Sequence, residues 1–262
     1  MIISVNLGAQ VVDENPQKLS AIDIVEHLGD TIPLDLEFVD DSGKAVVLHD
    51  YFRDGRPVIL IMGYYTCPML CNLVFNGVSE AVDQLDLKPS EDFQILSISI
   101  DTTEIYEVAG AKKANYLKNM KRQILPDGWF FLTDPYNNSK KLAEAIGFQY
   151  YYDTDTEQFA HPAVITILSA EGKISRYLYG IEFKPNDLRL AVKEAAEGKI
   201  VSTVDKIILY CYQYDPEAGS YVVLAGNVMK LGGLLVFILF IFFLAVMWIK
   251  DYRRKAFRIN EL

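Results

Sequence analysis

Long apolar runs alternate with segments of helical spacing along most of the chain. The runs at 57–64 and 93–100 carry no charged residue, as expected of strands buried on both faces of a sheet. Between them, the segment 70–85 repeats apolar residues every three or four positions, which is typical of an amphipathic helix. This strand–helix–strand order predicts an α/β domain.

The rest of the domain continues the same alternation. A hairpin is expected at 38–48 around the turn Asp41-Ser42-Gly43, and one short helix is expected at 21–28. Further strands are expected at 129–132, 148–152, 163–168 and 174–179, and further helices at 105–125, 137–146 and 186–196. A closing hairpin followed by a helix predicts a thioredoxin-like mixed sheet with flanking helices.

A second pattern appears near the C-terminus, where residues 231–249 read LGGLLVFILFIFFLAVMWI. Nineteen residues without a charge are long enough to cross the hydrocarbon core of a bilayer. A buried core helix is disfavoured because such a helix seldom presents large apolar side chains on every face. The sequence therefore predicts one C-terminal transmembrane helix at 230–249.

Charges around this span predict its orientation. Basic residues dominate the segment 250–262, whereas the residues before the span carry little positive charge. The positive-inside bias places 250–262 in the cytoplasm as a tail and the large domain on the outer side. An external domain needs an export signal, and residues 1–9 resemble the end of a signal peptide with a small-residue site at Gly8-Ala9.

Composition narrows the class of protein. A formal net charge of −10 argues against nucleic-acid binding, which needs clustered Lys and Arg. Three cysteines are too few for a disulfide-stapled scaffold. The expected organisation is an N-terminal extension at 1–30, a thioredoxin-like domain at 31–199 and a bridge at 200–229 that leads to the membrane.

The chemistry of the chain is concentrated in Cys67-Pro68-Met69-Leu70-Cys71, directly after the apolar run 57–64. Two thiols at this spacing can form a disulfide or bind a soft metal ion, and a helix N-terminus favours their thiolate forms. A purely structural disulfide is disfavoured because so short a loop constrains the unfolded chain little. Structural zinc is also disfavoured because it needs four protein ligands.

His161 comes ninety residues after Cys71, just before the predicted strand at 163–168. In a thioredoxin-like fold the loop that enters this strand lies against the cysteine pair, so His161 can reach the sulfurs. Two thiolates and an imidazole suit copper, because thiolates select Cu(I) and imidazole helps to hold Cu(II). The remaining candidates have simpler interpretations. His27 and His49 are expected to be solvated, Cys211 to be a half-buried free thiol, and Asp101 and Asp134 to be turn or cap residues.

Four ordered motifs resemble the Sco/SenC family of membrane-tethered copper proteins over residues 33–216. They are the block 64–72 (YYTCPMLCN), Ala160-His161, the segment 175–180 (SRYLYG), and 209–212 with Tyr214-Asp215-Pro216. Many family members carry an N-terminal anchor, whereas this chain is expected to have a C-terminal one. In this respect the chain resembles a bacterial branch of the family.

The resemblance implies a function for these residues. Cys67, Cys71 and His161 would bind one copper ion, as Cu(I) or Cu(II), for delivery to the binuclear copper site of cytochrome c oxidase during its assembly. The partner would be the copper-site subunit of the oxidase or another respiratory complex. The implied location is a bacterial inner membrane, single-pass, with the soluble domain on the periplasmic side.

Two alternatives remain open. In the first, the chain is a thiol–disulfide oxidoreductase whose redox pair, Cys67 and Cys71, keeps the oxidase cysteines reduced. In the second, it is a non-catalytic accessory subunit of a respiratory complex. A metallochaperone is favoured over an enzyme.

Overall fold

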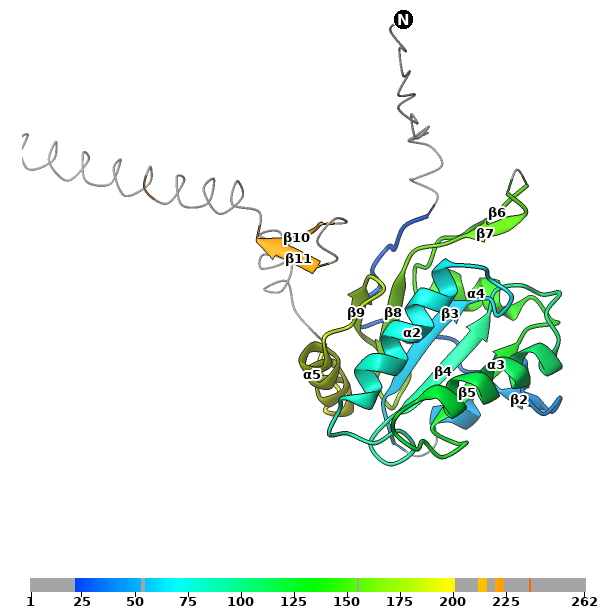
Figure 1. Ribbon diagram of the computed structural model, residues 1–262, viewed down its shortest axis with the longest axis horizontal. Helices are drawn as coiled ribbons and strands as arrows, with labels where there is room; N and C mark the ends of the chain where they lie inside the picture. The colour runs from blue at the N-terminus through cyan, green and yellow to red at the C-terminus, as the bar shows by residue number, and fades with distance from the viewer. Residues whose placement is uncertain are drawn as a thin grey trace, which may run out of the picture. The chain divides into compact units, whose positions relative to one another are not determined.

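The structure, a computed structural model, describes residues 22–52, 55–154, 156–200, 212–215, 220–223 and Val236. The chain divides into two compact units, at 1–201 and 202–262. The first unit contains a seven-stranded sheet in the order β2-β1-β5-β4-β3-β8-β9 (Figure 1). Its strands are β1 (Glu37–Asp40), β2 (Ala45–Val47), β3 (Val58–Gly63), β4 (Gln94–Ser99), β5 (Trp129–Thr133), β8 (Val164–Leu168) and β9 (Ile174–Tyr179).

Helices connect these strands and cover the sheet. They are the 3-10 helix η1 (Leu48–Phe52), α2 (Leu70–Asp83), α3 (Tyr106–Asn119), α4 (Asn138–Ala145) and α5 (Pro185–Ala196). The short strands β6 (Tyr151–Asp153) and β7 (Gln158–Ala160) pair with each other in a separate two-stranded ribbon.

The centre of the sheet is parallel and fully buried. Strands β3, β4 and β5 run parallel, and every residue of β3 and β4 is buried. This burial explains why both strands read as continuous apolar runs instead of alternating ones. Strands β8 and β9 then add to the β3 edge as an antiparallel pair, with α5 following. The result is the predicted thioredoxin-like mixed sheet with flanking helices.

An aromatic layer fixes the helix that carries the cysteine pair. Phe75 on α2 packs against Tyr116 on α3 and against Phe131 on β5, with ring centroids 5.6 and 5.9 Å apart. Trp129 joins the same cluster and donates from its indole nitrogen to the Ser97 hydroxyl at 2.8 Å. In Figure 1, α2 and α3 lie side by side in front of the central strands. Truncating Phe75 to Ala would cost about 3–5 kcal/mol of stability.

The N-terminal part of the described chain corrects one prediction. Residues 22–30 form no helix and run as an extended segment over the domain. The backbone N–H of Val25 donates to Gly147 O at 2.9 Å, and that of Gly29 donates to Ile174 O at 2.8 Å. Gly147 has φ +66°, and a Cβ there would lie 1.7 Å from Val25 O, so this approach requires glycine. Tertiary hydrogen bonds outweigh the local helix signal.

Two element boundaries also differ from expectation. The helix predicted at 105–125 ends at Asn119, because the Asp83 carboxylate accepts the backbone N–H groups of Lys121 and Arg122, both at 2.9 Å. The strand predicted at 148–152 begins only at Tyr151, because Phe148 pairs with Ile24 instead.

The second unit is described only in part. Strands β10 (Tyr212–Asp215) and β11 (Ser220–Val223) form an antiparallel pair within the predicted bridge. None of the helices in the described part of the chain has the length and apolar character needed to cross a membrane. The span predicted at 230–249 lies outside the described residues apart from Val236, as do residues 1–9, the tail at 250–262 and Cys211.

Candidate metal centre

The cysteine pair lies where β3 gives way to α2. The strand ends at Gly63, and the helix begins at Leu70, after Met69 in the N-cap position. Cys67 therefore stands in the loop before the helix, and Cys71 lies in the first helical turn. Both are free thiols with exposed fractions of 5% and 2%. The backbone N–H of Cys71 donates to the Cys67 sulfur at 3.3 Å, so the helix N-terminus points its unsatisfied donors at this sulfur.

The end of β3 leaves room for the second sulfur. A Cβ on Gly63 would lie 3.3 Å from Cys71 Sγ, which is tighter than most real contacts. The next residue, Tyr64, donates its backbone N–H to the same sulfur at 3.5 Å. Gly63 therefore permits the close approach of Cys71 to the strand.

His161 completes the group. Its Nε2 lies 2.9 Å from Cys71 Sγ, and its Nδ1 lies 3.0 Å from the carbonyl oxygen of Pro162. Because a carbonyl can only accept, Nδ1 carries a proton, and Nε2 is the ring nitrogen that faces the sulfur. The ring is 4% exposed and stacks on Phe148, with the centroids 5.8 Å apart. The structure thus brings together the three residues that the sequence singled out.

The two thiols share one proton. The pKa of the Cys67 thiol falls to about 3, first because the Cys71 thiol donates a hydrogen bond to it and then because of His161 and backbone N–H groups. The pKa of Cys71 rises, because it gives that hydrogen bond and is buried. The reduced pair therefore holds a thiolate at Cys67 and a thiol at Cys71.

Thiol sulfurs and an imidazole nitrogen are ligands that suit a soft metal ion. In this structure they are in contact with one another. No group of three or more His, Cys, Asp or Glu side chains in the described ranges is already arranged to hold a metal ion. The 2.9 Å between Nε2 and Sγ is a hydrogen-bond distance. Metal bonds of roughly 2.0 Å to nitrogen and 2.3 Å to sulfur would hold the two atoms somewhat further apart. Binding therefore requires loss of the shared proton and a small separation of the side chains.

A buried carboxylate holds the loop before Cys67. Glu104 is 6% exposed and accepts three hydrogen bonds, from the backbone N–H groups of Tyr65 at 2.8 Å and Thr66 at 2.6 Å and from the Ser99 hydroxyl at 2.7 Å. Sequence reasoning missed Glu104. One signal could have found it, because residues that follow adjacent parallel strands meet at the same sheet edge.

A lysine and an amide also hold this loop. Lys112 donates to the carbonyl oxygen of Tyr65 at 2.8 Å and to Asn72 Oδ1, while Asn72 Nδ2 donates to Cys67 O at 2.8 Å. Burial lowers the pKa of Lys112, and its electrostatic interaction with the cysteine pair and with Glu104 opposes this effect. No local sequence pattern marks Lys112, because its role depends on how α3 packs beside α2.

The other candidates lie elsewhere. Asp101 accepts the N–H of Thr103 in a turn, and Asp134 accepts the N–H of Ser139 at the start of α4, as predicted for turn and cap residues. His49 is exposed. His27 is half-buried, with Nδ1 2.9 Å from Ala145 O, so the prediction that it is solvated was wrong.

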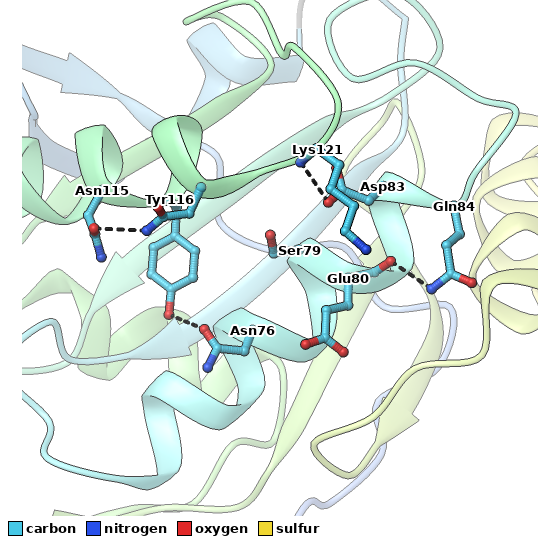
Figure 2. Close-up of a pocket in the computed structure, with 9 residues that line it drawn as sticks. Asn76, Ser79, Glu80, Asp83, Gln84, Asn115, Tyr116 and Lys121 are labelled. Atoms are coloured by element: carbon cyan, nitrogen blue, oxygen red, sulfur yellow. Dashed lines mark hydrogen bonds between the residues drawn. The ribbon is translucent and has the colours of Figure 1, made fainter.

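A cavity of about 430 Å³, lined mostly by residues with polar side chains, lies between α2 and α3 (Figure 2). Tyr116 lines this cavity, and its hydroxyl donates to Asn76 Oδ1 at 2.9 Å. Amide and carboxylate side chains supply most of the rest, and no cysteine or histidine lines it. The thiol chemistry is therefore separate from this cavity.

Comparison with known proteins places the chain in a family. The SCO1/SenC family model matches residues 28–197. A protein from Aquifex aeolicus VF5, provisionally described as an electron transfer protein, is 25% identical over 66% of this chain and 95% of its own, with a TM-score of 0.57. A SCO1/SenC family lipoprotein from Bacillus anthracis str. Ames is 16% identical over 66% of this chain and 99% of its own, with a TM-score of 0.53.

ScoI from Arabidopsis thaliana, whose structure has copper bound, is 20% identical over 65% of this chain and 99% of its own, with a TM-score of 0.49. No curated protein matches the sequence. The family match covers well over half of the chain and includes the cysteine pair and the histidine. The chain therefore belongs to the SCO1/SenC family.

Proposed function

We propose that this protein binds copper through Cys67, Cys71 and His161 and delivers it to the binuclear copper site of cytochrome c oxidase during assembly. One observation carries the proposal, which is the 2.9 Å contact between His161 Nε2 and the sulfur of Cys71, a residue whose backbone N–H donates to the Cys67 sulfur. Two thiolates and an imidazole form a soft donor set that selects copper over hard cations. Membership of the SCO1/SenC family adds support.

The chemistry of binding follows from the protonation states. The ion displaces the proton that the two thiols share, so that both sulfurs become thiolates. His161 turns Nε2 toward the sulfur of Cys71, where it can coordinate a metal ion once it carries no proton, while Nδ1 stays bonded to the Pro162 carbonyl. Release to a client would proceed by ligand exchange, in which client cysteines replace the protein's sulfurs one at a time. The ion need never be free in solution.

The burial of the three candidate ligands suits a protein that carries copper. Both sulfurs and the imidazole are at most 5% exposed, which keeps a soft ion from water and from stray thiols. Met69, between the two cysteines, is 68% exposed and marks the side from which a client can approach. Ligand exchange with the client would then require the short loop before α2 to move.

A second candidate, a thiol–disulfide oxidoreductase acting on the same oxidase cysteines, is favoured by one observation. The depressed pKa of Cys67 makes it a thiolate at neutral pH, and the buried Cys71 beside it is placed to resolve a mixed disulfide. In this role His161 would matter less than the cysteines.

A direct test loads the reduced protein with Cu(I) in the presence of a competing chelator. The proposal expects about one copper per chain in the native protein, almost none after the double change Cys67→Ser and Cys71→Ser, and weaker binding after His161→Ala. Oxidase maturation should then fail with both variants. Normal maturation in His161→Ala would favour the oxidoreductase. Normal maturation in both variants would favour an accessory subunit.

We further propose that residues 231–249 tether the domain to a bacterial inner membrane, with the domain in the periplasm and residues 250–262 in the cytoplasm. The support is the uncharged span and the basic residues that follow it. A thiol reagent that cannot cross the membrane, applied to cells without their outer membrane, should label a cysteine introduced in the domain but not one introduced at Asn260. Labelling of the tail alone would reverse the proposed orientation.

A further inference from the structure

The positive charge of Lys112 lies beside the thiol site without touching either sulfur. Its ammonium donates to Tyr65 O at 2.8 Å and to the side-chain oxygen of Asn72. Asn72 in turn donates to the carbonyl oxygen of Cys67 at 2.8 Å. One cation on α3 is thus connected to the loop before Cys67 and to the first turn of α2.

Aromatic rings and negatively charged groups surround the Lys112 ammonium. The ammonium also lies 5.7 Å from the ring centroid of Phe75 and 5.9 Å from that of Tyr116, so it is held within the aromatic layer. Glu104 contributes a buried negative charge at the same loop, where it accepts the backbone N–H of Tyr65. Thiol chemistry adds further negative charge, because both disulfide exchange and soft-metal binding use thiolates. Buried negative charge is costly unless a cation compensates it.

We propose that Lys112 is a positioning residue of the cysteine site, whose charge stabilises the reduced pair Cys67–Cys71 relative to its disulfide. The inference rests on the proposed function in one respect, because it takes Cys67 and Cys71 as the functional site. It deepens that function, because a pair held reduced stays ready to accept copper.

The redox step balances as follows. Two electrons and one proton break the Cys67–Cys71 bond. They leave a thiolate on Cys67, whose sulfur accepts the backbone N–H of Cys71 at the start of α2 at 3.3 Å, and a proton on Cys71. Two glutathione molecules supply the electrons, form glutathione disulfide and release two protons, of which Cys71 keeps one. The reduced site is therefore one unit more negative than the disulfide, so a nearby cation favours reduction.

The test measures the dithiol–disulfide equilibrium of the metal-free protein in glutathione buffers at pH 7. Lys112→Gln keeps a donor but removes the charge, Lys112→Met removes both, and Lys118→Gln removes the same charge from an exposed position on α3. We expect the two Lys112 variants to shift the equilibrium about tenfold toward the disulfide, or ~30 mV. Lys118→Gln should stay within about twofold of the native protein.

An unchanged equilibrium in both Lys112 variants would overturn the inference. So would a shift in Lys112→Met that Lys112→Gln restores, because the hydrogen bond and not the charge would then be responsible. An equal shift in Lys118→Gln would assign the effect to overall charge. Since no copper is present, these outcomes do not depend on whether the protein carries it, and copper binding is measured separately.

Discussion

The imidazole Nε2 of His161 lies 2.9 Å from the sulfur of Cys71, although ninety residues separate them in the sequence. The sheet register explains this contact. Strand β8 runs antiparallel to β3 and pairs Thr166 with Leu60, so the residues just before β8 lie beside the end of β3. The cysteine loop leaves β3 at that same end. The two chemical groups therefore meet because of how these strands pair.

Replacing His161 by Ala should weaken Cu(I) binding by about tenfold or more, corresponding to ~1.4 kcal/mol or more of binding free energy, while stoichiometry at saturation stays near one. The physical reason is that the two thiolates remain and only the imidazole nitrogen is lost. Competition titration with a Cu(I) chelator measures the change. His27→Ala is the matched control, because His27 is also partly buried but bonds to Ala145 O away from the sulfurs. Equal affinities in both variants would contradict the assignment of His161 as a ligand.

Alkylation of Cys67 in the reduced, metal-free protein should depend little on pH between 5 and 8. The pKa of Cys67 is depressed, so its thiolate persists as the pH falls and is lost only near the folded pKa, far below neutrality. An ordinary thiol with a pKa near 8.5 would slow by about 10³-fold over the same range. Iodoacetamide rates followed by mass spectrometry test this. A rate that falls tenfold for each pH unit would mean that Cys67 has an ordinary pKa.

Glu104→Gln should destabilise the protein by about 2–4 kcal/mol, measured by urea unfolding. The two carboxylate oxygens accept the backbone N–H groups of Tyr65 and Thr66, one each, so the NH₂ group of the amide would face one of these donors. Glu91→Gln is a suitable control, because Glu91 forms an exposed ion pair with Lys88 that contributes at most about 1 kcal/mol. Similar costs for the two changes would show that Glu104 does not hold the loop.

Gly63→Ala should reduce copper affinity more than it reduces stability. The added Cβ would meet Cys71 Sγ at 3.3 Å and displace it by a few tenths of an ångström, whereas overpacking of this size costs about 1–3 kcal/mol of unfolding free energy. Chelator competition and urea unfolding on the same preparation separate the two effects. Native affinity in a folded variant would show that the position of Cys71 tolerates such a displacement.

The central elements were predictable because burial leaves a clear pattern in the sequence. Strands β3 and β4 lie within the two apolar runs, because all of their residues are buried. Helix α2 lies within the predicted helix, because one of its sides is buried. The cysteine pair and His161 were predictable as a group because thiols and imidazole are few in this chain. Their convergence followed from the fold that the pattern indicated.

What escaped prediction depends on tertiary contacts. Residues 22–30 carry apolar spacing, yet backbone bonds to Gly147 and Ile174 hold them extended. Glu104 and Lys112 look like ordinary surface charges in the sequence. Only the packing of α3, and of the segment between β4 and α3, beside the cysteine loop reveals their partners. Long-range hydrogen bonds of this kind leave no local periodicity.

X-ray absorption at the copper edge tests the copper assignment most directly, on protein loaded with one equivalent of Cu(I) and on its His161→Ala variant. The native protein should show two sulfur neighbours and one imidazole nitrogen, and the variant should lose the imidazole scattering while keeping both sulfurs. A native spectrum without sulfur, or one identical to that of His161→Ala, would contradict a copper site built from Cys67, Cys71 and His161.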